Sequence, residues 1–212
     1  MTFTNFTLVP APVAVLALLG TAASTVALLA AAAFSGLAGR TGSAKNLGLA
    51  GTALPAFYAL LLVGLGAATP ARVVLRGGEK FFCEIDCHVG YSVTDVKESG
   101  ETGLRRLAVT VLSRFDEKTI SPRRGNGPLK PNPRAAALVD AAGRRFAAAP
   151  AGVAALLVPL RPGGSYATAL AFEVPGDAEG LRLSLVESEG PVRLLLGHER
   201  APLAGETRLA LN

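Results

Sequence analysis

The chain has 212 residues, half of them apolar, and a formal net charge of +5. It has no tryptophan and three tyrosines, so it lacks the basic residues interleaved with stacking aromatic side chains that are typical of nucleic-acid-binding proteins. We therefore expect no nucleic-acid partner. Charge is also unevenly distributed, because residues 1–71 contain only Arg40 and Lys45 as charged residues, unlike a uniform globular protein.

Two uncharged apolar runs fill this N-terminal part, at residues 8–39 and 47–70. Each is longer than the roughly 20 residues that a helix needs to cross a bilayer. The first run also lacks the basic n-region that precedes the apolar core of a signal peptide. The pattern predicts a transmembrane hairpin whose helices cover about 10–36 and 47–69, joined by a loop at 39–46.

The connecting loop decides the expected orientation of the hairpin. It carries Arg40 and Lys45 and no acidic residue, and basic loops tend to stay in the cytoplasm. We therefore expect the domain at residues 79–212, after a linker at 72–78, to lie outside the cytoplasm. The opposing signal is a group of basic residues soon after the second helix: Arg72, Arg76 and Lys80.

From residue 79 onward, apolar and polar residues alternate with the period of β-strands. Residues 81–93 are predicted to form one long strand, or two strands joined by a bend at Gly90. Prolines and glycines predict an irregular segment at 119–135, whose basic residues we interpret as solvated, with contact to anionic headgroups as the functional alternative. No amphipathic helix is expected in this part. Further strands are predicted at 104–115, 135–140, 144–150, 165–175, 181–187, 192–198 and 207–212, a pattern typical of an antiparallel sandwich.

The first predicted strand contains both cysteines of the chain, Cys83 and Cys87, followed by His88. In a regular strand the two cysteines continue the apolar face and are buried as small hydrophobic residues. His88 then lies on the opposite, polar face beside Glu84 and Asp86, whose carboxylates favour its protonated form. We prefer this interpretation because it requires no special geometry.

Three chemical alternatives for this stretch remain open. A disulfide needs Cα atoms within about 7 Å, but residues four apart in a strand are about 13 Å apart, and no glycine or proline signals a turn between the cysteines. Covalent haem would use a C-x3-C-H run, one residue longer than the usual motif, with His198 as the only other histidine. A metal site from Cys83, Cys87 and His88 suits copper or zinc, provided a bulge brings the imidazole to the cysteine face.

The C-terminal part also carries a recognisable pattern. The pattern begins with a strand, a D-x-x-G-like turn and a second strand. It continues with L-x-P-G, a strand ending in V-P, and one further strand. The matching residues are Leu160, Pro162, Gly163, Val174, Pro175 and Leu181. On this pattern, residues 79–187 resemble the bacterial immunoglobulin-like domains of unknown function found on lipoproteins and secreted proteins, which are similar to a mycobacterial immunoprotective extracellular antigen. The resemblance implies an extracytoplasmic immunoglobulin-like sandwich and carries no catalytic residue.

A second resemblance concerns the cysteine spacing. Cys83 and Cys87 match the two cysteines of C-x-E-x-C, although Glu84 lies one position early, no methionine follows and no histidine precedes them. A β-sandwich after two membrane helices, with this spacing, resembles subunit II of haem-copper oxidases such as cytochrome oxidase. The resemblance is architectural, and it implies copper as the cofactor of an alternative function.

Catalytic signatures are absent from the sequence: there is no G-x-S-x-G, P-loop or H-E-x-x-H motif. Glu98, Glu101, Asp116 and Glu117 are interpreted as solvated residues at turns and strand ends, so we expect no enzyme and no cofactor. The combined prediction is a two-helix anchor in the bacterial inner membrane that displays a non-catalytic binding or scaffolding sandwich. Its expected partners are the lipid bilayer and a membrane protein, docked on the small residues of the helices; the alternative is a copper-binding redox protein that uses Cys83, Cys87 and His88. A small-molecule ligand is not specified.

Overall fold

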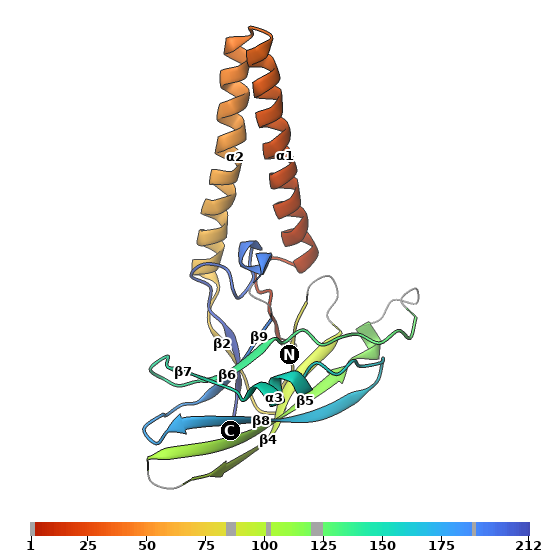
Figure 1. The fold of residues 1–212 in the computed structure, drawn as a ribbon, viewed down its shortest axis with the longest axis vertical. Coiled ribbons are helices and arrows are strands. Elements are labelled where there is room, and N and C mark those ends of the chain that lie inside the picture. The colour runs from red at the N-terminus through yellow and green to blue at the C-terminus, as the bar shows by residue number, and fades with distance from the viewer. Residues whose placement is uncertain (1–2, 84–87, 101–102, 120–124, 188–189) are drawn as a thin grey trace. The chain divides into compact units, whose positions relative to one another are not determined.

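The structure, a computed structural model, describes residues 3–83, 88–100, 103–119, 125–187 and 190–212 (Figure 1). The chain divides into two compact units. A sandwich unit comprises Met1–Asn5, Ala71–Gly190 and Glu206–Asn212, and a helical unit comprises Phe6–Pro70 and Pro191–Gly205. The chain therefore passes between the units four times, whereas the sequence predicted a single passage through a linker at 72–78.

The helical unit contains the two predicted apolar helices, α1 (Ala11–Leu37) and α2 (Thr41–Ala68), which lie side by side as a hairpin (Figure 1). Both are long and apolar enough to cross a membrane. Their connection is shorter than predicted, because α2 begins at Thr41. Gly39 adopts a φ of 73° and the N–H of Arg40 donates to Ser35 O over 2.9 Å, an arrangement that ends α1 within one tight turn.

One five-stranded sheet of the sandwich unit has the order β1-β3-β4-β5-β8. Its pairs are antiparallel except for the parallel pair β1–β3. The prediction of strands at 104–115 and 165–175 is confirmed by β5 and β8. The strands are β1 (Phe3–Thr4), β3 (Lys80–Phe81), β4 (Val89–Ser99), β5 (Leu104–Phe115) and β8 (Ser165–Pro175).

The other sheet has the order β2-β10-β9-β6-β7, again mixed because β2 and β10 run parallel. The strands predicted at 135–140 and 144–150 are confirmed by β6 and β7, which form an antiparallel pair. The strand β2 lies within the segment predicted as a linker. The strands are β2 (Arg72–Val74), β6 (Ala135–Val139), β7 (Arg145–Ala147), β9 (Arg182–Val186) and β10 (Thr207–Ala210).

The two sheets enclose one hydrophobic core, to which alternate residues of their strands contribute. Val109 and Val111 of β5, Leu170 of β8, and Leu138 and Leu183 of the other sheet are all fully buried. A mostly-β domain of two sheets, as the alternating pattern predicted, is therefore confirmed, but the prediction of an antiparallel sandwich is wrong in one respect, because each sheet contains one parallel pair. Three short helical turns complete the described residues: η1 (Glu117–Thr119), α3 (Pro150–Ala155) and η2 (Pro191–Leu194).

Two predicted strands are wrong. Residues 81–93 do not form one strand, because Phe81 of β3 lies opposite Gly90 of β4 in an antiparallel pair, so the chain reverses between them. The alternative of a bend at Gly90 is also wrong, because β4 runs through Gly90 without a change of register. In this register Lys80 pairs with Tyr91, so an even-numbered position of β3 shares a face with an odd-numbered position of β4, and the predicted alternation does not run through the reversal. Residues 192–198 form η2 and turns instead of a strand; Pro191, which lacks a backbone donor, starts the helical turn.

Candidate functional site

Cys83 lies just after β3, where the chain begins to reverse. It is buried and disulfide-bonded, and the only other cysteine of the chain is Cys87, which lies outside the described residues. The N–H of Cys83 donates to Asn5 Oδ1 over 2.8 Å, and Asn5 Nδ2 donates to Glu187 Oε1 over 3.0 Å. The prediction of a free buried thiol at Cys83 is therefore wrong, because a reversal of the chain allows what a straight strand forbids.

His88 begins the described chain after this reversal, at the start of β4. It is buried, with its ring stacked on Phe115 at a centroid distance of 5.4 Å. The prediction that it lies on the polar face of a strand is therefore wrong. Glu84 and Asp86, the carboxylates expected beside it, lie outside the described residues.

The predicted metal site joined Cys83, Cys87 and His88. A sulfur in a disulfide is not a thiolate, and thiolate is the form in which cysteine binds metals. Among the residues that the structure describes, no cluster of three or more histidine, cysteine or acidic side chains is placed to hold a metal ion. Because Cys87 is not among them, the three-residue site stays a prediction, and it requires reduction of the disulfide.

A cluster of polar and charged side chains around Glu206 links three strands of the second sheet, β7, β9 and β10. The carboxylate of Glu206 accepts hydrogen bonds from Ser184 Oγ, from Arg145 Nη1 at 3.2 Å and from Arg208 Nε at 3.1 Å. Burial acts to raise the pKa of Glu206, but the hydrogen bonds from Ser184 and Arg145 and the charges of Arg145 and Lys80 outweigh it and lower that pKa below its usual value. The carboxylate is therefore held ionised, and the cluster stabilises the sheet.

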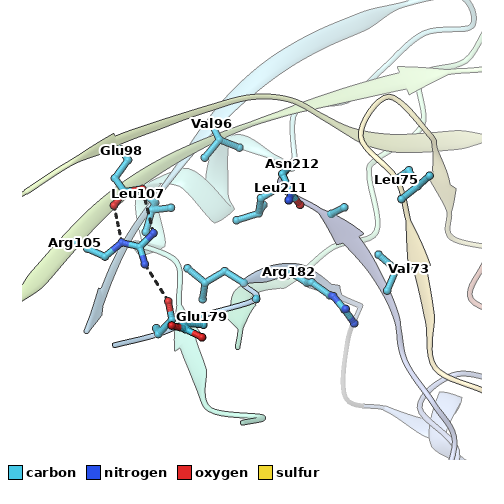
Figure 2. A pocket seen from close by; sticks show the side chains of 14 residues that line it. Val73, Leu75, Val96, Glu98, Arg105, Leu107, Glu179, Arg182, Leu211 and Asn212 are labelled. Atoms are coloured by element: carbon cyan, nitrogen blue, oxygen red, sulfur yellow. Dashed lines mark hydrogen bonds and ion pairs between the residues drawn. The ribbon is translucent and has the colours of Figure 1, made fainter. Parts of the chain in front are cut away.

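A pocket of about 750 Å³ opens at one end of the sandwich, between the two sheets (Figure 2). This volume is within the range of ligand-binding pockets. Its walls are mostly apolar, and the side chains of Val96, Leu107 and Leu211 line one shared space. The lining comes from β2, β4, β5, the β8–β9 loop, and the end of β10 with the residues after it, so that both sheets contribute.

Charged groups stand on two sides of this pocket. On one side, Arg105 donates to both carboxylate oxygens of Glu98, at 2.6 and 3.1 Å, and to Ala178 O at 2.9 Å. The hydrogen bonds from Arg105 lower the pKa of Glu98. Glu179 lies on the same side, and Arg182 extends from β9 on the other (Figure 2). The arrangement suits an apolar ligand that carries an anionic group for Arg182.

A smaller hollow of about 390 Å³ lies elsewhere on the sandwich unit. Alanines of β5, of β8 and of β7 with the two residues after it form much of its wall, and the exposed ion pair of Arg106 and Glu173, at 3.1 Å, lies at it. Because exposed ion pairs contribute little binding energy, this hollow offers fewer distinctive contacts than the larger pocket.

The larger pocket was not predicted from the sequence. Glu98 was interpreted as a solvated residue; it is exposed, but its partner Arg105, seven positions later, ties it to the wall of the pocket. Two charged residues of opposite sign at facing strand ends were the only available signal. Comparison of the chain with protein-family models, with curated proteins and with solved structures finds no match.

Proposed function

We propose that this protein is a membrane-anchored, non-catalytic binding module of the bacterial inner membrane, in which α1 and α2 span the bilayer and the sandwich unit binds a partner. The observation that carries the proposal is the pocket of about 750 Å³ between the sheets. None of the fourteen residues lining it is a serine, threonine, cysteine, histidine or lysine. A pocket without nucleophiles or a histidine base suits recognition better than chemistry.

The sandwich unit is placed outside the cytoplasm in this proposal. Arg40 and Lys45 mark the turn of the hairpin as the cytoplasmic end. The disulfide at Cys83 supports the same orientation, because disulfides persist in oxidising compartments and are rare in the cytosol. A reporter enzyme fused after Asn212 should be active only if it folds outside the cytoplasm; activity confined to cytoplasmic reporters would contradict this orientation.

The sandwich is proposed to be immunoglobulin-like. In that fold one sheet joins strands B and E, and the other joins C, F and G. The pairs β5–β8, β6–β9 and β9–β10 reproduce these three neighbours when β5 is taken as strand B. The parallel pair β2–β10 and the extra parallel strand β1 extend the two sheets at their edges.

The proposed ligand is a segment of a partner membrane protein that has apolar side chains and one carboxylate. Leucine and valine side chains of both sheets would bury the apolar part, which is the main source of affinity in such sites. Arg182 would receive the carboxylate. As an accessory subunit, the protein would thereby hold its partner beside the membrane.

Site-specific photocrosslinking of the full chain in its native membrane tests this proposal. A photoreactive residue in place of Leu211, in the pocket, should give a crosslinked adduct, whereas the same residue in place of exposed Ala169 on β8 should not. Arg182→Glu should remove most of the adduct at position 211, because it repels the carboxylate. Equal adducts at both positions, or an adduct that Arg182→Glu leaves unchanged, would show that the pocket is not the binding site.

The alternative function, copper-based electron transfer, requires a thiolate at Cys83 that the disulfide does not supply. Copper analysis of the full chain before and after reduction tests it. Stoichiometric copper that is lost in Cys83→Ser would favour the alternative over the binding module.

A further inference from the structure

Residues 191–205 belong to the helical unit, although the sequence predicted a strand of the sandwich there. The segment follows the last three turns of α2. The N–H of Gly205 donates to Thr69 O over 2.9 Å, and Tyr58 Oη donates to Leu194 O over 2.7 Å. Between these two points Pro202 O approaches Gly66 so closely that a Cβ on the glycine would lie 2.0 Å from it. The backbone of the segment therefore lies directly against the helix.

The same segment also contacts the residues that lead into α1. The N–H of Thr7 donates to Gly197 O over 3.0 Å, and the rings of Phe6 and His198 pack edge to face at 4.8 Å. The 191–205 segment is thus held between the start of α1 and the end of α2. Its place in the helical unit is set by contacts to α2 and to the residues that lead into α1.

The position of Tyr58 determines how deep this segment would lie in a bilayer. Tyr58 precedes Ala68, the last residue of α2, by ten positions, which is about 15 Å along the axis at 1.5 Å per residue. A hydrocarbon core of about 30 Å that starts at Leu47, after the last charged residue of the hairpin, extends over about 20 residues to Gly66. Tyr58 would then lie inside the core, eight residues or about 12 Å from its outer end at Gly66, and Leu194, whose carbonyl accepts the hydrogen bond from Tyr58, would lie among the acyl chains of the outer half of the bilayer.

Two leucines of the segment are exposed to solvent. Leu194 is 49% exposed and Leu203 is 72% exposed. Leu203 also has a φ of 66°, a left-handed conformation that residues other than glycine seldom adopt. Leu203 thus combines an unfavourable backbone conformation with a large apolar side chain that the protein does not cover.

We propose that residues 191–205 form an interfacial membrane element, in which Leu194 and Leu203 insert into the outer half of the bilayer beside α2, Leu203 near the headgroups and Leu194 deeper among the acyl chains. The proposal rests on the proposed function in one respect, that α1 and α2 span the membrane. Lipid is assigned as the partner of the two exposed leucines. The segment that carries them runs along α2, whose own exposed apolar side chains are proposed to face lipid. The hydrogen bond from Tyr58 satisfies Leu194 O, as irregular backbone at this depth requires.

Depth-dependent fluorescence quenching tests this inference, because the chain has no tryptophan of its own. Full-length Leu194→Trp and Leu203→Trp variants are placed in phosphatidylcholine and phosphatidylglycerol vesicles that contain lipids brominated near either the glycerol end or the methyl end of the acyl chain. Leu104→Trp on β5 is the matched control for Leu194, with 47% exposure against 49%, and Leu60→Trp on α2 matches Leu203 at 72%. Circular dichroism confirms that each variant is folded.

The tryptophan at 203 should be quenched more strongly by bromine near the glycerol end than near the methyl end, and the tryptophan at 194 should be quenched by bromine at either place. The tryptophan at 60 should be quenched strongly by the brominated lipids, and the tryptophan at 104 should be quenched by neither of the two. If position 60 is quenched but 194 and 203 are not, the interfacial element is overturned while the membrane span stands. If position 60 is not quenched, the span itself fails and the inference fails with it. A blue-shifted but unquenched tryptophan at 194 or 203 would assign the surface to protein instead of lipid.

Discussion

Leu183 in the sandwich unit and Leu60 in the helical unit are the same residue type in opposite surroundings. Leu183 is fully buried between the two sheets, whereas Leu60 is 72% exposed on α2. The contrast holds for the helices in general: only 6% of the most apolar window of α1 and 11% of that of α2 are buried by the chain itself. Burial of apolar surface stabilises the sandwich from within, whereas the two helices leave most of their apolar surface uncovered by the chain and are long and apolar enough to place it in a membrane.

Polar groups follow the same division. In the sandwich unit, burial is compatible with charge because partners are built in, as for Glu206 with Ser184, Arg145 and Arg208. α1 contains no charged residue, and α2 contains only Lys45, in its second turn. A helix in lipid has no such partners available, so exclusion of charge replaces pairing of charge.

The largest expected effect comes from removing core volume. Leu183→Ala should lower the free energy of unfolding of the sandwich unit by about 2–5 kcal/mol, because it removes buried methyl groups and leaves a cavity. Leu60→Ala, at an exposed position on α2, should leave the sandwich unit unchanged. Chemical unfolding of the full chain in detergent, followed by near-ultraviolet circular dichroism, checks both. A loss of similar size from Leu60→Ala would mean that protein covers this face of α2 and would break the comparison.

Removing the buried carboxylate should have the next largest effect. Glu206→Gln should lower the free energy of unfolding of the sandwich unit by about 2–3 kcal/mol, because two arginines lose the negative charge that both of them bind. The control is Glu173→Gln, whose ion pair with Arg106 is exposed on both sides and should contribute less than about 1 kcal/mol. The same unfolding measurement compares them. Equal costs would show that burial of Glu206 adds nothing to its interactions.

The pH dependence sharpens this prediction. Because folding lowers the pKa of Glu206 below its usual value of 4.5, its stabilising contribution is complete above that pH. The contribution is lost as the pH falls through the lower, folded-state pKa. Unfolding measured at stepwise lower pH should therefore show a loss of stability below pH 4.5 that is smaller in Glu206→Gln. An identical acid profile in the variant would exclude Glu206 as the source.

The disulfide should give the smallest of the three effects. In the chain-entropy account a short loop of this kind stabilises by about 2 kcal/mol, so the paired Cys83→Ser and Cys87→Ser variant should lose about that much in the sandwich unit. The helical unit should keep its helical circular dichroism. A thiol-alkylating reagent should add to the unfolded, unreduced chain at no site, and at two sites after reduction. Labelling of two thiols without reduction would contradict the disulfide.

Prediction from the sequence succeeded where one element carries its own signal. β5 and β8 match their predicted ranges because Val109, Val111 and Leu170 alternate with polar or small residues over a long stretch. It failed for the candidate site because the pocket depends on which strand ends meet. Arg182 and Leu211 lie on β9 and just after β10, and neither residue's neighbours in the sequence indicate a shared pocket.

The amino-acid sequence alone determined the two apolar helices and the alternating strands, because length without charge and a period of two are local properties of the chain. Only the tertiary structure decided that the chain reverses at Cys83 and that residues 191–205 leave the sandwich for α2. Both decisions depend on partners far away in the sequence. A strand pattern indicates which face of the strand is apolar, but it does not indicate which other part of the protein packs against that face.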